Sequence, residues 1–214
     1  MYGLYEDEEL TELVTAEGSL TNPDDETDLN GDDGKTAVKA LWCAVIQSQL
    51  AAAITDTEAV EIEVDNAYFR FTDLPVIKID DELMYVTAGL SPASTTLTVI
   101  RGWNSTTAAT HLIDARVYMA YNVENVVVVC RDNEQVVTGD ESSYVTYCLD
   151  DGLGDPDGSY SAELALGDID YDESVAFHRK VVIPEDTDAV SKQDLIHDLK
   201  GPSDTSFKLI ALDS

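Results

Sequence analysis

The sequence predicts an all-β protein made of two small antiparallel domains of β-sandwich or barrel-like form. Hydrophobic residues make up 44% of the 214 residues, which is enough for a core and argues against wholesale disorder. From residue 58 onward, short β-branched runs recur at roughly ten-residue spacing, as in antiparallel meanders. Turns rich in Gly, Asp and Pro separate several runs, and 122–125 forms a short joint. We therefore expect one domain over residues 1–122 and another over 123–214.

The N-terminal region has few apolar anchors. Residues 1–36 are acidic and rich in turn formers, with Leu10, Leu13, Val14 and Leu20 as the clearest hydrophobic positions. The stretch 37–54 suits either a helix or a buried strand, because periodicity cannot separate the two in a short apolar run. We favour a strand, since the sequence that follows it is clearly β.

The remaining strands are predicted from alternating or β-branched runs. In the first domain they cover 61–64, 76–79, 82–87, 96–100 and 115–121. In the second domain they cover 126–131, 143–149, 159–166, 175–183 and 207–212. Residues 191–199 are compatible with a helical turn or with a strand.

The charge of the chain restricts its partners and its surroundings. Lys and Arg number 12 against 43 Asp and Glu, so the formal net charge is −31. We expect no nucleic acid partner, because the phosphates of a duplex would be repelled. The acidic residues are spread over the whole chain, and their mutual repulsion would vanish only at molar salt, where the Debye length is roughly 3 Å. This pattern resembles proteins of extreme halophiles and predicts a high-salt environment; the alternative is an acidic, calcium-rich extracellular module.

The sequence shows no membrane or secretory signal. No apolar run approaches the ~18 to 20 residues that a membrane span needs. The start, from Met1 to Glu6, has neither a basic nor an apolar region. We expect no membrane span and no secretory signal.

Cysteine usage is uninformative about a disulfide. Cys43, Cys130 and Cys148 show no CxxC spacing. Cys130 and Cys148 each end a predicted strand, so facing strands could bring them together. Free, buried thiols that behave as small hydrophobic side chains are the favoured interpretation.

Two acidic triplets have oxygen ligands at the spacing of a cation site. The first is Asp28, Asn30 and Asp32, and the second is Asp168, Asp170 and Asp172. An EF-hand loop requires Gly at its sixth position and Glu at its twelfth, whereas the first set has Asp33 and Lys39 there. Such triplets are expected by chance in so acidic a chain. We predict no cofactor; the alternative is Ca²⁺ or another cation at either set.

No catalytic motif is present in the sequence. His111, His178 and His197 are isolated from one another, and no HExxH, GxSxG or GxxxxGK[ST] pattern occurs. We therefore predict that the protein is not an enzyme.

One segment carries more information than composition. Arg101 follows an apolar strand and precedes Gly102, whose freedom at positive φ permits a sharp turn. Arg101 can bridge backbone carbonyls or pair with Glu82 on the facing strand. Side chains of the next loop can hydrogen-bond the loop to itself. The predicted structural turn consists of Glu82, Arg101, Gly102, Thr106, Thr107 and His111.

The same segment resembles structural proteins of tailed viruses. In that pattern a strand of the form D-x-E-x-(hydrophobic)-x-V is followed by TTLTV-x-RG, a GTTAAAH-like loop and a closing GA-x-V strand. Here the matching runs are 79–87, 95–111 and 115–118, and the resemblance covers roughly residues 48–120. The chain departs from the pattern at 103–105 and at Asp114, where small residues and Gly are common.

The resemblance, combined with the acidic composition, implies a virion protein of a tailed virus that infects halophilic archaea. We expect a capsid-surface decoration or vertex turret component, in the outer particle. Its partners would be other virion proteins and further copies of itself in a homo-oligomer of cyclic symmetry. The alternatives are a tail, baseplate or head–tail connector protein, or a module that binds host surface glycans.

Overall fold

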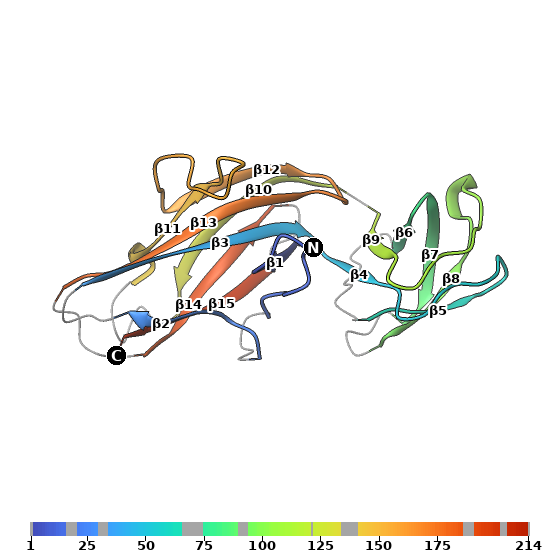
Figure 1. The fold of residues 1–214 in the computed structure, drawn as a ribbon, viewed down its shortest axis with the longest axis horizontal. Coiled ribbons are helices and arrows are strands. Elements are labelled where there is room, and N and C mark those ends of the chain that lie inside the picture. Colours follow the sequence, from blue (N-terminus) through green and yellow to red (C-terminus); the bar gives the residue numbers. More distant parts are fainter. Residues whose placement is uncertain are drawn as a thin grey trace. The chain divides into compact units, whose positions relative to one another are not determined.

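The computed structural model describes residues 2–15, 21–29, 34–65, 75–89, 94–120, 122–133, 141–185, 191–201 and 205–213 (Figure 1). The protein is all-β: these residues form fifteen strands and two short 3₁₀ turns, and no α-helix occurs among them. None of the helical turns in the described ranges is long and apolar enough to cross a membrane.

The chain divides into two compact units. One, here called the barrel unit, comprises Val45–Asn122 and Asp170–Asp172, and the other, the sandwich unit, comprises Tyr2–Ala44, Val123–Ile169 and Glu173–Ser214. The predicted boundary near residue 122 coincides with a boundary between the two units. The predicted assignment of residues 1–44 to the first domain differs from the structure, because the strand at 35–45 pairs along its length with the strand at 174–183. The barrel unit is therefore an insertion between two parts of the sandwich unit.

The barrel unit contains one six-stranded antiparallel sheet. Its strands are β4 (Gln47–Gln49), β5 (Glu61–Glu63), β6 (Val76–Ile79), β7 (Glu82–Ala88), β8 (Thr96–Ile100) and β9 (Arg116–Met119), in the order β4-β9-β6-β7-β8-β5, with a 3₁₀ turn, η1 (Trp103–Ser105). The sheet curls until its edges meet: the Ala51 amide donates to the Glu63 carbonyl and the Asp65 amide to the Gln49 carbonyl, both at 2.9 Å. Closure of this kind leaves few unpaired strand edges.

Alternation places the core of the barrel unit. On β7, Glu82, Met84 and Val86 are buried while the residues between them are partly exposed. The same alternation buries Leu97 and Val99 on β8. Glu82 thus occupies an inward position of β7, where the alternation predicts an apolar side chain.

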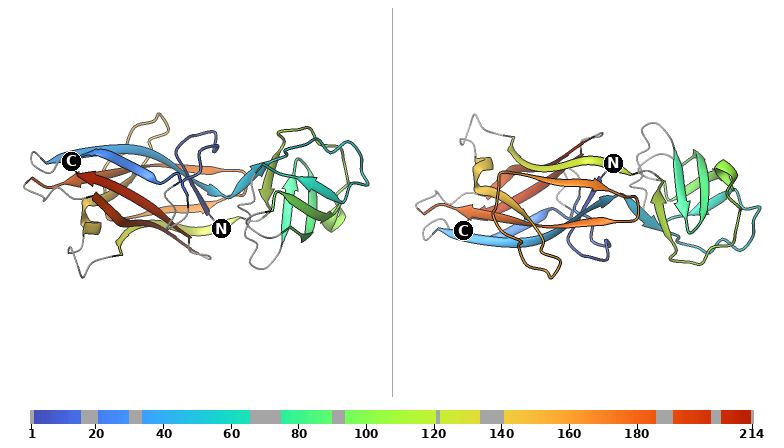
Figure 2. Two further views of the ribbon diagram at one scale, coloured as in Figure 1. Left: turned by 90° about the horizontal axis from the view of Figure 1, so that it is seen from below. Right: turned by 90° about the horizontal axis from the view of Figure 1, so that it is seen from above.

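The sandwich unit contains two sheets. The four-stranded sheet has the order β1-β3-β13-β11 and the five-stranded sheet the order β12-β10-β14-β15-β2. The strands are β1 (Tyr2–Tyr5), β2 (Asp24–Leu29), β3 (Lys35–Val45), β10 (Val123–Asp132), β11 (Val145–Leu149), β12 (Glu163–Ile169), β13 (Ser174–Ile183), β14 (Ser191–Lys200) and β15 (Thr205–Asp213), with a 3₁₀ turn, η2 (Glu141–Tyr144). Strand β2 runs parallel to β15, whereas the other registered pairings are antiparallel. The two sheets face one another, as Figure 2 shows.

Most predicted strands are present. The preference for a strand in the stretch 37–54 is confirmed by β3 over 37–45 and by the short β4 at 47–49, whereas 50–54 lies outside both strands, and the open choice at 191–199 is resolved as β14. Strands β1 and β2 lie in the region that showed only turn signals. Strand β12 begins at Glu163 rather than 159, and the start of the run at 143–149 is the 3₁₀ turn η2.

Candidate functional site

Glu82 is the centre of a hydrogen-bond network in the barrel unit. Its Oε1 accepts from Arg101 Nε at 2.7 Å and from the Gly102 amide at 2.9 Å. Its Oε2 accepts from Arg101 Nη2 at 2.8 Å and from the Ala109 amide at 3.0 Å. His111 Nε2 lies 2.9 Å from the same oxygen. One carboxylate therefore contacts four residues of the segment that follows β8.

This carboxylate remains ionised although it is buried. Glu82 is 1% exposed. Burial alone raises the pKa of Glu82, but hydrogen bonds from Arg101, His111 and two backbone amides outweigh it and lower the pKa to about 2. Arg101 compensates the charge through a two-pronged contact, the strong geometry for a guanidinium and a carboxylate.

Arg101 also reaches backbone carbonyls, as the sequence suggests. Its Nη1 donates to the carbonyls of Asp56, at 3.4 Å, and Ala59, at 3.3 Å, and its Nη2 donates to the carbonyl of Ala109. The side chain thus joins the segment before β5, the inward face of β7 and the loop after β8. Its guanidinium is almost enclosed, with 6% of the side chain exposed.

His111 ties the loop to the β6–β7 turn. Its Nδ1 lies 2.7 Å from Asp80 Oδ2, and its Nε2 faces Glu82. Because both carboxylates can only accept, the two hydrogen bonds form together when the ring carries both protons. The backbone of His111 also exchanges two hydrogen bonds with Ile54 at 2.9 Å each.

The other predicted turn residues behave differently from one another. Gly102 has φ +58°, the positive value that the sequence predicts, and a Cβ there would lie 2.9 Å from the Thr106 carbonyl. Thr106 Oγ1 accepts from the Leu83 amide at 3.1 Å and contacts the Trp103 carbonyl at 2.9 Å. Thr107 is exposed and has no part in the network just described.

A second buried network lies between the sheets of the sandwich unit. Asp24 of β2 is fully buried and accepts from Arg179 Nε at 3.1 Å and Nη2 at 2.9 Å. Its Oδ1 lies 3.0 Å from Lys39 Nζ and its Oδ2 lies 2.7 Å from His197 Nε2. His197 Nδ1 in turn lies 2.6 Å from the hydroxyl of Tyr147. The network joins β2 and β14 of one sheet to β3, β11 and β13 of the other.

Charges in this network are mutually compensated. Burial raises the pKa of Asp24, but Arg179, His197 and Lys39 together hold it well below its usual range. Burial raises the pKa of Tyr147 well above its ordinary value, so this hydroxyl stays protonated. Tyr147, His197 and Asp24 are each 0% exposed, so the hydrogen bonds that join them are enclosed in the interior of the fold.

Sequence reasoning missed the second network. Arg179 stands on β13 between the buried residues Phe177 and Val181, at an inward position. Lys39 occupies the matching position on β3, opposite Arg179 in the register. A cation at an apolar position of a strand signals a buried partner, although the sequence does not say which carboxylate provides it.

The other candidate groups show no assembled site. Asn30, Asp32 and the side chain of Asp28 lie outside the described residues. Asp168 Oδ1 accepts from the Asn125 amide at 2.9 Å, and the described residues contain no group of three or more His, Cys, Asp or Glu side chains placed to hold a metal ion.

The three cysteines are free and buried, the interpretation that the sequence favours. Burial raises the pKa of Cys130 to about 12, so its thiol is not ionised at neutral pH.

Comparisons with known proteins give no relative: no family model, no curated protein and no solved structure matches this chain.

Proposed function

We propose that the protein is a structural component of the virion of a tailed virus of halophilic archaea, placed on the capsid surface as a decoration or vertex turret protein. The observation that carries the proposal is the segment 79–118, whose sequence resembles virion proteins of tailed viruses. In the structure this segment folds as β7, β8 and β9 with the loop between β8 and β9 tied to Glu82.

The chemistry of the Glu82 network supports a scaffold role. Each donor around the carboxylate comes from the loop that the network holds, and the guanidinium and carboxylate are buried together. Such an arrangement fixes backbone geometry, which is what a repeated contact between many identical subunits requires. The net charge of −31 supports an exterior that faces concentrated salt.

Labelled cryo-electron microscopy of purified virions tests the proposal. An antibody raised against the protein should mark the capsid, and the copy number per particle should match the icosahedral shell or its fivefold vertices. Label confined to the tail would refute the capsid position and retain the structural role. A protein missing from purified particles would refute both.

One observation favours glycan binding as a second candidate. The rings of Tyr85 and Trp103 lie 4.6 Å apart with a tilt of 34°, next to the exposed side chain of Asn104. Aromatic faces beside amide groups are suited to sugars, which offer both apolar faces and hydroxyls. A glycan array at molar salt should then show binding that Trp103→Ala removes. No binding to any glycan on the array would refute this candidate.

A further inference from the structure

The outward positions of β3 and β13 in the four-stranded sheet hold no acidic residue, although the Asp150 carboxylate of a neighbouring loop lies against His178. On β3 the outward positions alternate from Thr36 to Ala44, and on β13 they alternate from Ser174 to Val182, as the register of the two strands requires. None of these positions holds Asp or Glu. At the chain's average frequency of 43 acidic residues in 214, ten positions would hold about two, so these two strands are modestly poorer in acid than the chain as a whole.

Part of this face is apolar and open. Val38 is 50% exposed and Val182 38% exposed, whereas Ala40, Trp42 and Ala176 are half-buried. With Thr36, these residues define what we call the β3 face. Lys180 lies opposite Val38 in the register and borders this face, whose own side chains are apolar or uncharged and suited to a contact.

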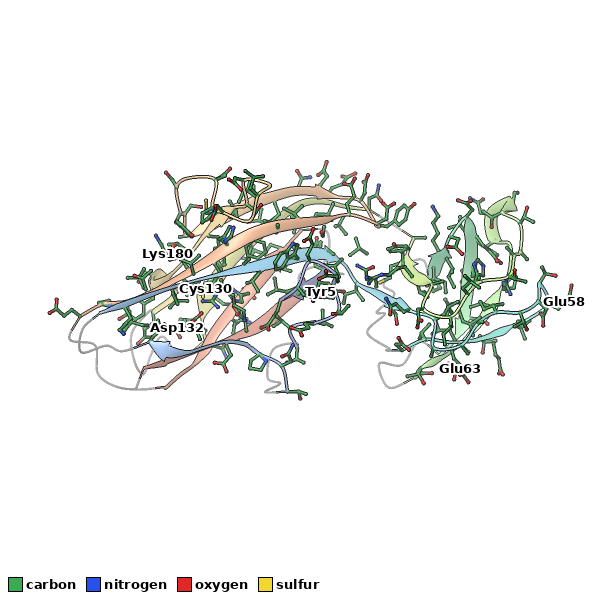
Figure 3. The ribbon with its side chains drawn as sticks, viewed as in Figure 1. Tyr5, Glu58, Glu63, Cys130, Asp132 and Lys180 are labelled. Carbon is green, nitrogen blue, oxygen red and sulfur yellow. The ribbon has the colours of Figure 1, made fainter. Side chains whose placement is uncertain are left out.

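A loop covers the neighbouring part of the sheet, so the open part is limited to β3 and the adjoining side of β13. His178 Nε2 lies 2.9 Å from Asp150 Oδ2, and Lys180 Nζ lies 4.0 Å from the centre of the Tyr160 ring. Lys180 projects from β13 in Figure 3. The β3 face is therefore bordered by a hydrogen-bonded loop on the β11 side.

We propose that the β3 face packs against the β3 face of a second copy of this chain, forming a dimer with twofold symmetry. The argument is electrostatic. Two chains of charge −31 repel one another wherever carboxylates meet, so self-association is favoured where both surfaces lack them. Packing a face against itself satisfies this condition on both sides and closes the assembly at two copies.

The size of the face sets the strength of the contact. Two whole strands of ten residues, at about 3.4 Å per residue and about 4.8 Å between strands, would present roughly 300 Å² per copy, and the loop on the β11 side leaves less than this open. A stable interface buries more than about 1,200 Å² in total. The dimer should therefore be weak, form at about 10–100 µM or above, and strengthen with salt as the remaining repulsion is screened.

Sedimentation velocity at molar salt over a concentration series tests the proposal. The native protein should shift from monomer to dimer as concentration rises. Val38→Asp and Val182→Asp should each stay monomeric over the same range, because each places a carboxylate within the contact. Val60→Asp is the matched control: Val60 is 57% exposed on the barrel unit, and this variant should dimerise like the native protein. Melting curves establish that each variant is folded.

Three results would overturn the inference. They are a native protein that stays monomeric up to millimolar concentration, a dimer that neither Val38→Asp nor Val182→Asp weakens, and a trimer or larger ring. None of these results bears on whether the protein belongs to a virion, so this inference and the proposed function fail separately.

Discussion

Glu82→Gln should destabilise the barrel unit by about 3–5 kcal/mol, the cost of removing one partner from a buried ion pair. The amide retains one acceptor for Arg101 Nε and the Gly102 amide. Its NH₂ group replaces the oxygen that now faces Arg101 Nη2, the Ala109 amide and His111. These three groups would then face a hydrogen-bond donor and lose their acceptor.

The lowered pKa of Glu82 gives an independent value for the stability that the network contributes. A decrease from 4.5 in the unfolded chain to about 2 in the fold corresponds to about 3 kcal/mol of stability at neutral pH. Because the folded pKa is the lower one, this contribution is present above about pH 4.5 and is lost as the pH falls toward 2. The native barrel unit should lose it on acidification, and Glu82→Gln should lack that component of the pH dependence.

Urea unfolding at molar salt measures both effects. Trp42→Phe leaves Trp103 as the fluorescent reporter of the barrel unit, since the sequence has two Trp residues. The control is Glu63→Gln, a change to an exposed carboxylate on β5 that is labelled in Figure 3 and should alter the free energy of unfolding by less than about 0.5 kcal/mol. A loss below about 1 kcal/mol for Glu82→Gln would refute the role assigned to the network.

Three further predictions concern backbone geometry, the second network and salt. Gly102→Val should lower the melting temperature or prevent folding, because the residue has φ +58°, whereas Gly158→Val, with open space around it, should melt normally. Arg179→Met should cost about 3–5 kcal/mol in denaturant unfolding, and Arg131→Met, whose side chain is 34% exposed, about 1 kcal/mol or less; equal losses would contradict the account. Lowering salt from molar to tens of millimolar should reduce the β signal in circular dichroism, and an unchanged spectrum would contradict the halophilic interpretation.

Local pattern predicted most of the strands because alternation is a property of a few adjacent residues. For that reason the hairpin from β6 to β7, the following β8 and the turn at Gly102 could be predicted from the sequence. The pairing of Arg101 with Glu82 could be predicted because both residues belong to the same short meander.

Long-range pairings could not be predicted in the same way. Strand β3 pairs with β13, more than a hundred residues later, so a domain boundary drawn by proximity in sequence assigned residues 1–44 to the other unit. Asp24 stands in an acidic, turn-rich stretch, and nothing local distinguishes it from its neighbour Asp25. Its importance arises from Arg179 and His197, which only the tertiary fold brings to it.

The interrupted connectivity of the sandwich unit has a consequence for folding during synthesis. Strand β3 leaves the ribosome long before β13 is synthesised, so it remains unpaired with β13 during that time. Within the intervening barrel unit, β6, β7 and β8 pair in sequence order and can form a sheet as soon as they emerge, since short loops close at little entropic cost. Pulse-labelled hydrogen exchange on stalled chains should therefore find β6 to β8 protected first, with β3 acquiring protection only after β13 has been made.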